Sequence, residues 1–290
     1  MKKYSHLLWT LLFLLLLGSI PVILYNRGVA TARIIGFVVL IAIIIALWYW
    51  RFELRKKSKR NERIKLNTND KFWLDRHISF YHKLSKEDQK IFNDRVGIFL
   101  ADVQITEVDK DVAEKETCLY VASSAVIAYW GLPYFNYGEL QEVLVYPSNF
   151  NMDNTLNERG RVGGKVHHGG LMDRTMILSL PELIKGFQID NDKKNVGVHE
   201  FSHLLDKSDG SIDGIPPYMG DEDRKIWLKI MEREMERIKN DNSTVPDYGA
   251  INKTEFFAVA SEYYKECPKL LKVKHKELYD VLDKYYSQSE

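Results

Sequence analysis

The chain has 290 residues, of which 41 are Lys or Arg and 40 are Asp or Glu, so its formal net charge is +1. With only 2 cysteines, 8 prolines and 17 glycines, it is neither a disulfide scaffold, nor a collagen-like chain, nor a disordered tail. The near-neutral total also argues against a protein held to nucleic acid by bulk positive charge, so no nucleic-acid partner is expected.

The charge is distributed unevenly along the chain. Residues 1–50 hold four basic residues and no acidic ones, and residues 51–65 hold eight basic residues and two acidic ones. From residue 66 onward, 29 basic residues stand against 38 acidic ones, a net charge of −9. The total of +1 is therefore the sum of three electrostatically different zones.

The first zone contains two uncharged apolar runs, residues 7–25 and 34–50. Each is close to the roughly 20 residues that a helix needs to cross the hydrocarbon core of a bilayer. Aromatic residues lie near the ends of the runs, where interfacial belts form. The pattern predicts a transmembrane hairpin within residues 1–50.

Basic residues predict the orientation of this hairpin. Lys2 and Lys3 precede the first run, and the basic segment 51–65 follows the second. The positive-inside rule then predicts a two-span protein of the inner (cytoplasmic) membrane, with the domain after residue 50 in the cytoplasm. The juxtamembrane segment 51–78 would place its basic residues against anionic lipid. The alternative is a cleaved signal peptide, with residues 30–32 as the cleavage site.

Residues 79–290 alternate helical and strand patterns, taken here in chain order. Ser85 opens a helix from Lys86 to about Ala101, and an apolar helix is expected over residues 118–132. Strands are expected at 142–146 and 175–178, a loop at 151–170, and helices at 181–185, 193–207, 221–240, 252–266 and 275–287. The fold class is therefore α+β, rich in helix, with a small sheet.

The most informative motif lies within the predicted helix 193–207. His199 and His203 are four residues apart, so one helical turn places both imidazoles on the same face. Two imidazoles so placed can share one Zn²⁺ ion at about 2.0–2.1 Å. Glu200, next to the first histidine, can reach water at the ion without binding the ion itself. The motif predicts one zinc site per chain.

A catalytic zinc needs a third protein ligand. Glu255 is one interpretation, because it opens an apolar helix; the alternative is that Asn252 and Glu255 form a capping box that needs no metal. His167 and His168 could also bind metal, or could simply be solvated loop residues. Tyr248 lies in a glycine-containing loop, seven residues before Glu255.

The sequences HEFSHLLD and DYGAINKTEFFAVASEYY resemble those of the MtfA (Mlc titration factor A) family of zinc-dependent peptidases. The Tyr-to-Glu spacing is similar to that in the catalytic domain of anthrax lethal factor. The resemblance implies a zincin-like metallopeptidase domain over residues 79–290. In that domain His199, His203 and Glu255 bind zinc, Glu200 is the general base, and Tyr248 stabilises the transition state.

The resemblance also makes Asp206, three residues after His203, a candidate for holding a zinc ligand in place. It is incomplete at residues 165–174, where a Gly-Glu-Ala-Trp-like element is expected and is missing. The membrane hairpin is a second departure, because the family members compared are soluble.

Three functions follow as hypotheses. The leading one is a membrane-anchored zinc metallopeptidase acting on a peptide or protein substrate, with residues 175–178 as the edge strand along which substrate lies. The second, implied by the MtfA resemblance, is a binding protein that sequesters a cytoplasmic regulator such as a transcriptional repressor, with a structural zinc. The third is a membrane scaffold.

Overall fold

The computed structural model describes residues 40–44, 47, 64–133, 137, 140–148, 164–166, 174–189 and 191–287. The chain divides into two compact units, Met1–Asn61 and Glu62–Glu290. In the first unit, residues 40–44 and 47 are helical. Within the described part of the chain, no helix is both long enough and apolar enough to cross a membrane. Apart from that short stretch, the predicted spans 7–25 and 34–50 lie outside the described residues, so the hairpin stays a prediction.

The second unit opens with helices α3 (Thr68–His77), α4 (Ser79–His82) and α5 (Lys86–Asp102). Asn67 caps α3 in a reciprocal capping box with Asp70. The Ser85 hydroxyl accepts the backbone N–H of Asp88 at 3.1 Å, which confirms the predicted start of α5. Helix α3 falls within the segment 51–78 that the charge pattern assigned to the membrane surface.

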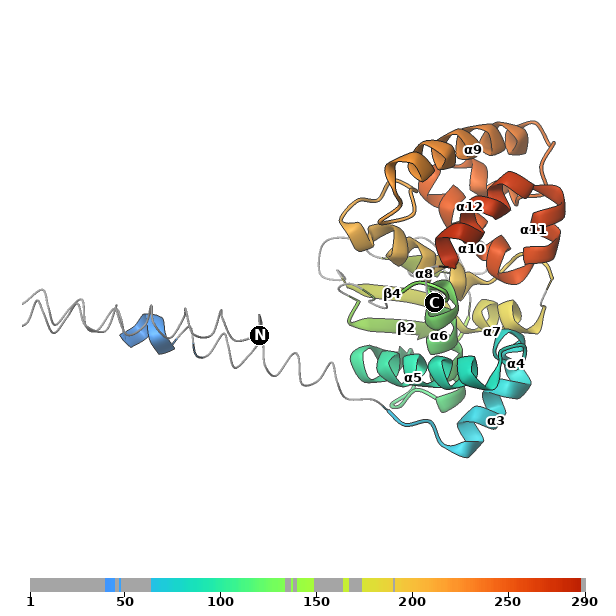
Figure 1. Cartoon of the computed structure of the whole chain (residues 1–290). Helices are drawn as coiled ribbons and strands as arrows, with labels where there is room; N and C mark the ends of the chain where they lie inside the picture. Colours follow the sequence, from blue (N-terminus) through green and yellow to red (C-terminus); the bar gives the residue numbers. More distant parts are fainter. Residues whose placement is uncertain are drawn as a thin grey trace, which may run out of the picture. The chain divides into compact units, whose positions relative to one another are not determined.

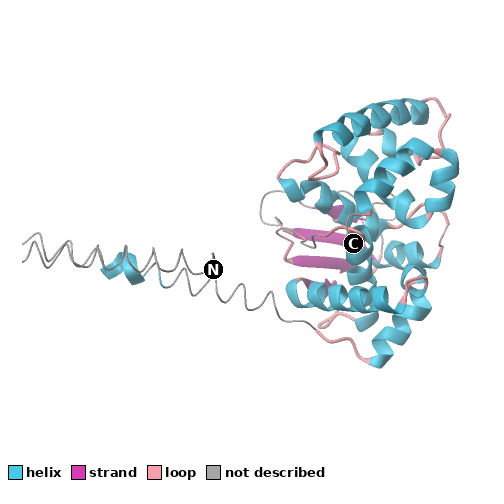
Figure 2. Ribbon diagram, in the orientation of Figure 1, coloured by secondary structure: helices cyan, strands magenta, loops and turns pink. Residues whose placement is uncertain are grey.

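Among the described residues, four strands form one sheet in the order β1 (Gln104–Glu107), β2 (Glu142–Tyr146), β4 (Thr175–Ser179), β3 (Gly164–Val166). The pairs β1/β2 and β2/β4 are parallel, and β3 runs antiparallel to β4. The small sheet among many helices confirms the α+β fold class (Figure 2). The predicted strands at 142–146 and 175–178 are present as β2 and β4.

Two predictions about the sheet are wrong. Strand β4 lies between β2 and β3, so residues 175–178 are not an edge strand; of the strands that the structure describes, β3 is the outermost on that side. The segment 151–170, expected to be entirely loop, contains β3. A three-residue strand is too short to show an alternating pattern, and the order of strands depends on pairings between residues far apart in the sequence.

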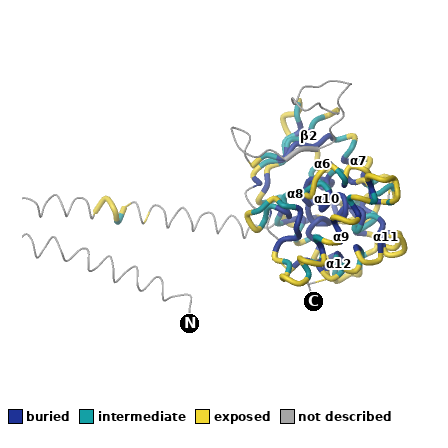
Figure 3. The backbone as a smooth tube through the Cα atoms, turned by 90° about the horizontal axis from the view of Figure 1, so that it is seen from above, coloured by how far each residue is buried: buried dark blue, intermediate teal, exposed yellow. Residues whose placement is uncertain are grey.

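The centre of this unit consists of three helices: α6 (Lys115–Ala128), α8 (Val196–Asp206) and α10 (Lys253–Glu266). Each packs against the other two, and α8 also contacts β3 and β4. They are buried, while exposed residues gather on the outer elements (Figure 3). The expected helix at 118–132 is α6, which begins three residues earlier and ends before Gly131, where φ is +88°.

The remaining helices are α7 (Leu180–Gln188), α9 (Asp221–Lys239), α11 (Pro268–Lys274) and α12 (Lys276–Tyr286). Figure 1 shows α9, α11 and α12 grouped on the same side of the sheet as α10, opposite α3–α5. Helices α9 and α12 confirm the helices that were predicted at residues 221–240 and 275–287. This arrangement places the start of α10 beside α8.

Gly197 allows α8 and α6 to approach closely. A Cβ atom at this position would lie 2.1 Å from the Ser124 hydroxyl oxygen and 2.5 Å from the Ser124 Cβ. We therefore expect Gly197→Ala to force the helices apart and to lower the free energy of unfolding by about 1–3 kcal/mol, despite the better helix propensity of Ala. Urea denaturation followed by circular dichroism measures the change.

The matched test of this packing is the double variant Gly197→Ala with Ser124→Gly, which removes the two atoms that the new methyl group would approach most closely. The double variant should recover part of the lost stability, as coupled neighbours do. An unchanged free energy of unfolding in Gly197→Ala would show that the close approach of α6 and α8 at this position does not matter for stability.

Candidate metal centre

Helix α8 begins at Val196 because Asn195 caps it. The Asn195 side-chain oxygen accepts the backbone N–H of Val198 at 3.1 Å, and its amide nitrogen donates to the Gly186 carbonyl at 3.2 Å. Lys193, just upstream, has φ +62°, which a helix does not tolerate. The helix therefore starts three residues later than residue 193, and its first turn is anchored in the core.

One turn of α8 brings His199 and His203 together. Their ring centroids are 4.9 Å apart, and their side chains are 12% and 16% exposed. Three apolar residues of the same helix, Val198, Phe201 and Leu205, are fully buried. Two imidazoles thus share one small, largely water-excluded face of the helix, as the four-residue spacing predicts.

Glu255 meets these histidines from the first turn of α10. Its carboxylate oxygen Oε2 lies 3.1 Å from Nε2 of His199 and 3.3 Å from Nε2 of His203. At the same site the Asn252 side chain accepts the backbone N–H of Glu255 at 2.9 Å. Capping and approach to the histidines are therefore compatible, because the cap uses the backbone of Glu255 and leaves its carboxylate directed at α8.

The three residues satisfy the geometry of a metal site. One atom from each of His199, His203 and Glu255 lies within 4.8 Å of the other two. Ligand atoms bound at 2.0–2.1 Å to a tetrahedral ion lie roughly 3.3 Å apart, which is close to the measured separations. Two imidazoles and one carboxylate are also a donor set used by catalytic zinc. The residues present fit this metal.

Charge in the site also favours a cation. Glu200 and Glu262 lie with Glu255 around the two imidazoles, and both are 6% exposed. Burial alone would lower the pKa of His199, but its hydrogen bonds with Glu255 and Glu262 raise it to about 10. Burial likewise opposes ionisation of Glu255, but hydrogen bonds with both histidines lower its pKa to about 2. Carboxylates gathered in a buried site require positive charge, which a divalent ion can supply.

Glu262 is a member of the site that the sequence patterns did not reveal. It lies two turns after Glu255 on α10, and its Oε2 is 3.3 Å from Nδ1 of His199. Its other carboxylate oxygen accepts the backbone N–H of Asn195. A carboxylate at Nδ1 fixes a proton on that nitrogen, so Nε2, which faces Glu255, is the ring nitrogen available to a metal ion. The i, i+7 spacing of the two glutamates was the available signal.

We expect Glu262→Gln to weaken zinc binding about 10- to 100-fold, because a single amide oxygen cannot serve both His199 and Asn195 as the carboxylate does. Competition against a chromophoric chelator measures the dissociation constant. Glu266→Gln, which alters a carboxylate bonded to Asn195 at 3.2 Å, is the matched control and should stay within about threefold of the parent. Equal zinc affinity in Glu262→Gln and in the parent would show that Glu262 does not support the metal ligands.

Glu200 lies on α8 directly after His199 and is buried, at 6% exposure. Burial raises the pKa of its carboxyl group, while the neighbouring charges of His199 and His203 act in the opposite direction. The structure therefore places a buried carboxyl group beside the three converging residues.

Tyr248 lies near His199, in the short 3₁₀ helix η2 (Asp247–Ala250). Its ring centroid is 5.7 Å from that of His199, and 52% of the residue is exposed. Partial burial, together with the charges of Glu255 and Glu200, raises the pKa of its hydroxyl, so the group remains a proton donor. A side chain that is half exposed beside the site can contact both solvent and a bound substrate.

Asp206 connects the end of α8 to the start of α10. It is fully buried, and its carboxylate accepts the backbone N–H of Gly214 at 3.1 and 3.2 Å. Gly214 has φ +72°, and a Cβ there would lie 2.1 Å from the carbonyl oxygen of Lys253. Asp206 thus holds a turn against the first residue of the helix that carries Glu255. His167 and His168, the other histidines considered above, lie outside the described residues.

Comparison with known proteins supports a peptidase interpretation. The family model described as glucose-regulated metallo-peptidase M90 matches residues 51–287. An uncharacterised protein from Synechocystis, slr2042, is 30% identical over 258 residues, which cover 86% of this chain and 94% of that protein.

Two further relatives are both called Mlc titration factor A. That of Pectobacterium atrosepticum is 29% identical over 159 residues, and that of Yersinia pestis (strain Pestoides F) is 28% identical over 159 residues. The matches cover 51% of this chain and 59% and 58% of the two relatives. The chain therefore aligns with little more than half the length of these proteins, which agrees with the resemblance inferred from its motifs.

Proposed function

The chain belongs to the glucose-regulated metallo-peptidase M90 family, and we propose that it hydrolyses peptide bonds in peptides or proteins as a zinc metallopeptidase. One observation carries the proposal: ligand atoms of His199, His203 and Glu255 converge within 4.8 Å beside the buried carboxyl group of Glu200. We propose that these three residues hold one zinc ion per chain, which when bound polarises the scissile carbonyl and acidifies a water molecule.

The other residues of the site then have distinct roles. Glu200 accepts a proton from the attacking water and passes it to the leaving amine, since it lies beside the ligands without being one of them. Tyr248 donates its hydroxyl to the oxygen on which negative charge develops. Glu262 orients His199 through Nδ1, and Asp206 holds the start of α10 in place.

The edge strand β3 is the proposed docking strand for substrate. It borders β4 on one side and lies against α8, the helix that carries the histidines. An extended peptide that pairs with an exposed strand edge gains backbone hydrogen bonds independently of its sequence. Pairing of substrate with β3 would bring its backbone alongside the candidate metal centre.

A peptide-library assay tests the proposed activity. The zinc-loaded full chain is incubated with the library, and new amino termini are identified by mass spectrometry. We expect cleavage at a recurring pattern of residues. A chain that holds one zinc ion and cleaves no member of a diverse library would contradict the peptidase function.

We also propose that the domain is anchored on the cytoplasmic side of the inner membrane by the hairpin at 7–25 and 34–50. The basic residues of 51–65 would then lie against anionic lipid. The uncharged runs and the charge bias of the sequence support this location. Added protease should degrade the domain only in permeabilised spheroplasts. Degradation in intact spheroplasts would show that the domain faces the outside of the membrane.

A second candidate function is capture of a protein regulator, favoured by the name titration factor that two relatives carry. In that case the zinc would be structural. Metal spectroscopy would then show four protein ligands and no exchangeable position, whereas the peptidase proposal requires three protein ligands.

A further inference from the structure

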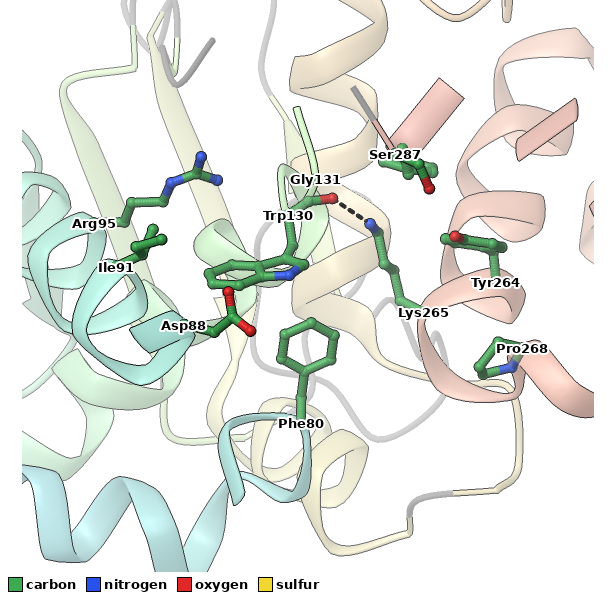
Figure 4. A pocket seen from close by; sticks show the side chains of 11 residues that line it. Phe80, Asp88, Ile91, Arg95, Trp130, Gly131, Tyr264, Lys265, Pro268 and Ser287 are labelled. Atoms are coloured by element: carbon green, nitrogen blue, oxygen red, sulfur yellow. Dashed lines mark hydrogen bonds between the residues drawn. The ribbon is translucent and has the colours of Figure 1, made fainter. Parts of the chain in front are cut away.

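A second pocket lies away from the candidate metal centre, between helices from the beginning and the end of the described domain. Its volume is about 540 Å³, within the range of small-molecule sites. Residues of α4 and α5, the segment after α6, and the helices α10 to α12 line it (Figure 4). Lys265, in its wall, follows Glu255 by ten residues on α10, a rise of roughly 15 Å along the helix. The pocket is therefore separate from the proposed zinc site.

Lys265 carries the primary amine among the lining residues that the structure describes. Its Nζ donates to the carbonyl oxygen of Trp130 at 2.7 Å and lies 3.5 Å from the ring centroid of Tyr286, whose face can accept an N–H group. Within the described residues, no carboxylate forms an ion pair with this nitrogen and no N–H or O–H group donates to it. The two contacts match the two N–H groups of a neutral amine and leave its lone pair unused, whereas an ammonium group has a third N–H to satisfy.

The surroundings of Lys265 favour the same neutral form. Burial lowers the pKa of its amine well below the ordinary value, and the positive charge of Arg95 lowers it further. A lysine with the ordinary pKa of about 10.4 is neutral in only roughly one molecule in 2,500 at pH 7. A lowered pKa raises this fraction, and the neutral amine is the nucleophilic form of lysine. Part of the Lys265 surface stays exposed, so a molecule in the pocket can reach it.

The walls around this amine are largely aromatic. Phe80 meets Trp130 edge to face at 5.8 Å, and Tyr264 stacks on Tyr286 at 5.3 Å. Figure 4 shows the Trp130 indole in the middle of the pocket, with the α5 residues on one side and Lys265 and Tyr264 on the other. Flat rings arranged in this way bind a flat apolar group by stacking and edge contacts.

The other charged side chains of the described lining are engaged in holding the fold. Asp88 accepts the Ser85 hydroxyl at 2.8 Å at the start of α5, and Arg95 donates to the carbonyl oxygen of Leu132 at 3.2 Å. The feature that remains for a ligand is an amine nucleophile among aromatic rings. Such a site suits an uncharged aromatic molecule that carries an electrophilic carbon.

We propose that this pocket takes up a small aromatic aldehyde and that the amine of Lys265 binds it covalently as an imine. The nitrogen lone pair forms a bond to the carbonyl carbon, and the π electrons of the C=O bond move to oxygen. A proton then passes from nitrogen to oxygen. The oxygen leaves with the second amine proton as one molecule of water, and a C=N bond remains. The reaction needs no oxidant and no reductant, and it is independent of the proposed zinc site.

The competing explanation is purely structural. In that case Lys265 is an ammonium group that holds the Trp130 carbonyl after α6 and lies over the Tyr286 ring on α12, a cation–π contact that joins the two helices. An ammonium group has no lone pair and does not attack a carbonyl carbon. The two explanations therefore differ in the reactivity of Lys265 toward aldehydes.

Reductive trapping measures this reactivity without any substitution. The full chain is incubated at pH 7 with benzaldehyde and sodium cyanoborohydride, which reduces each imine to a stable amine, and the adducts are located by peptide mass spectrometry. Lys269, exposed on α11 and outside the lining, is the reference in the same sample. We expect Lys265 to react at least about tenfold faster than Lys269. Equal rates, or no adduct on Lys265, would overturn the proposal and support the ammonium group.

Acetaldehyde and one variant test whether the aromatic walls select the ligand. Acetaldehyde lacks the ring, so the ratio of the Lys265 rate to the Lys269 rate should be at least about threefold smaller than with benzaldehyde. Phe80→Ala, which removes one wall, should lower the benzaldehyde rate at Lys265 by about two- to tenfold. Phe72→Ala, which makes the same change at a 65% exposed position on α3 outside the lining, should react as the parent does. The same ratio for both aldehydes, or a parental benzaldehyde rate in a folded Phe80→Ala variant, would overturn the assignment of an aromatic ligand.

Discussion

Glu200→Gln is expected to lower kcat for peptide hydrolysis by about 10²- to 10⁴-fold while the zinc content stays near one ion per chain. The carboxyl group of Glu200 is buried beside the converging ligands and is the group placed to move a proton. Glutamine keeps the shape of the side chain but cannot accept that proton. Steady-state cleavage of a fluorogenic peptide, together with metal analysis of the same sample, measures both quantities.

The matched control is Glu232→Gln, which makes the same chemical change at an exposed position on α9. This control should keep the parental kcat and zinc content. If Glu200→Gln kept more than about a tenth of the parental kcat, another group would have to be the base. Loss of zinc in the same variant would instead identify Glu200 as a ligand, contrary to the role proposed for it.

Removal of the metal is expected to have the second large effect. Dialysis against a strong chelator should reduce peptidase activity below detection, and one equivalent of zinc should restore it. Zinc binds the folded chain, in which the three ligands are close together, and does not bind the unfolded chain in the same way. The chelated protein should therefore also melt at a lower temperature. Activity that survives complete removal of zinc, verified by elemental analysis, would contradict a metal-dependent mechanism.

The chelated protein should show a particular dependence of stability on pH. The pKa of His199 is raised from 6.5 to about 10, so its stabilising contribution is fully present below about pH 6.5 and is lost as the pH rises through 10. The pKa of Glu255 is lowered from 4.5 to about 2, so its contribution is present above about pH 4.5 and is lost as the pH falls through 2. The pair therefore stabilises the metal-free fold most between about pH 4.5 and 6.5.

Thermal melts of the chelated protein from pH 3 to pH 10 test this dependence. His199→Ala should remove the loss of stability on the alkaline side, because the group that titrates there is absent. A melting temperature of the chelated parent that is flat between pH 6.5 and pH 10 would show that His199 does not carry the charge in the metal-free state.

The local parts of the site could be predicted from the sequence, because they depend on the geometry of one helix. The spacing of His199 and His203 already places both imidazoles on one face, and the structure has them on α8. The position of Glu255 could not be decided from spacing, since a capping role and a ligand role make similar demands on the sequence. The structure shows the capping contact to Asn252 and the approach to the histidines together.

Features that depend on distant pairings were not predictable in this way. Glu262 contacts His199 across 63 positions of sequence, and its i, i+7 spacing from Glu255 does not by itself distinguish it from a surface glutamate. The edge position of β3 follows from the parallel pairing of the other side of β4 with β2, in which Glu142 is the partner of Thr175. Strand order and contacts between helices are settled by tertiary packing, which periodicity does not report.

Zinc-edge X-ray absorption of the purified full chain tests the central claim most directly, namely that His199, His203 and Glu255 hold a catalytic zinc ion. The proposal predicts one zinc ion per chain with two nitrogen ligands and one carboxylate oxygen at about 2.0–2.1 Å, together with an exchangeable oxygen ligand. His199→Ala should lose one of the two nitrogen ligands or release the zinc ion altogether. A site with four protein ligands, or an unchanged spectrum in that variant, would contradict it.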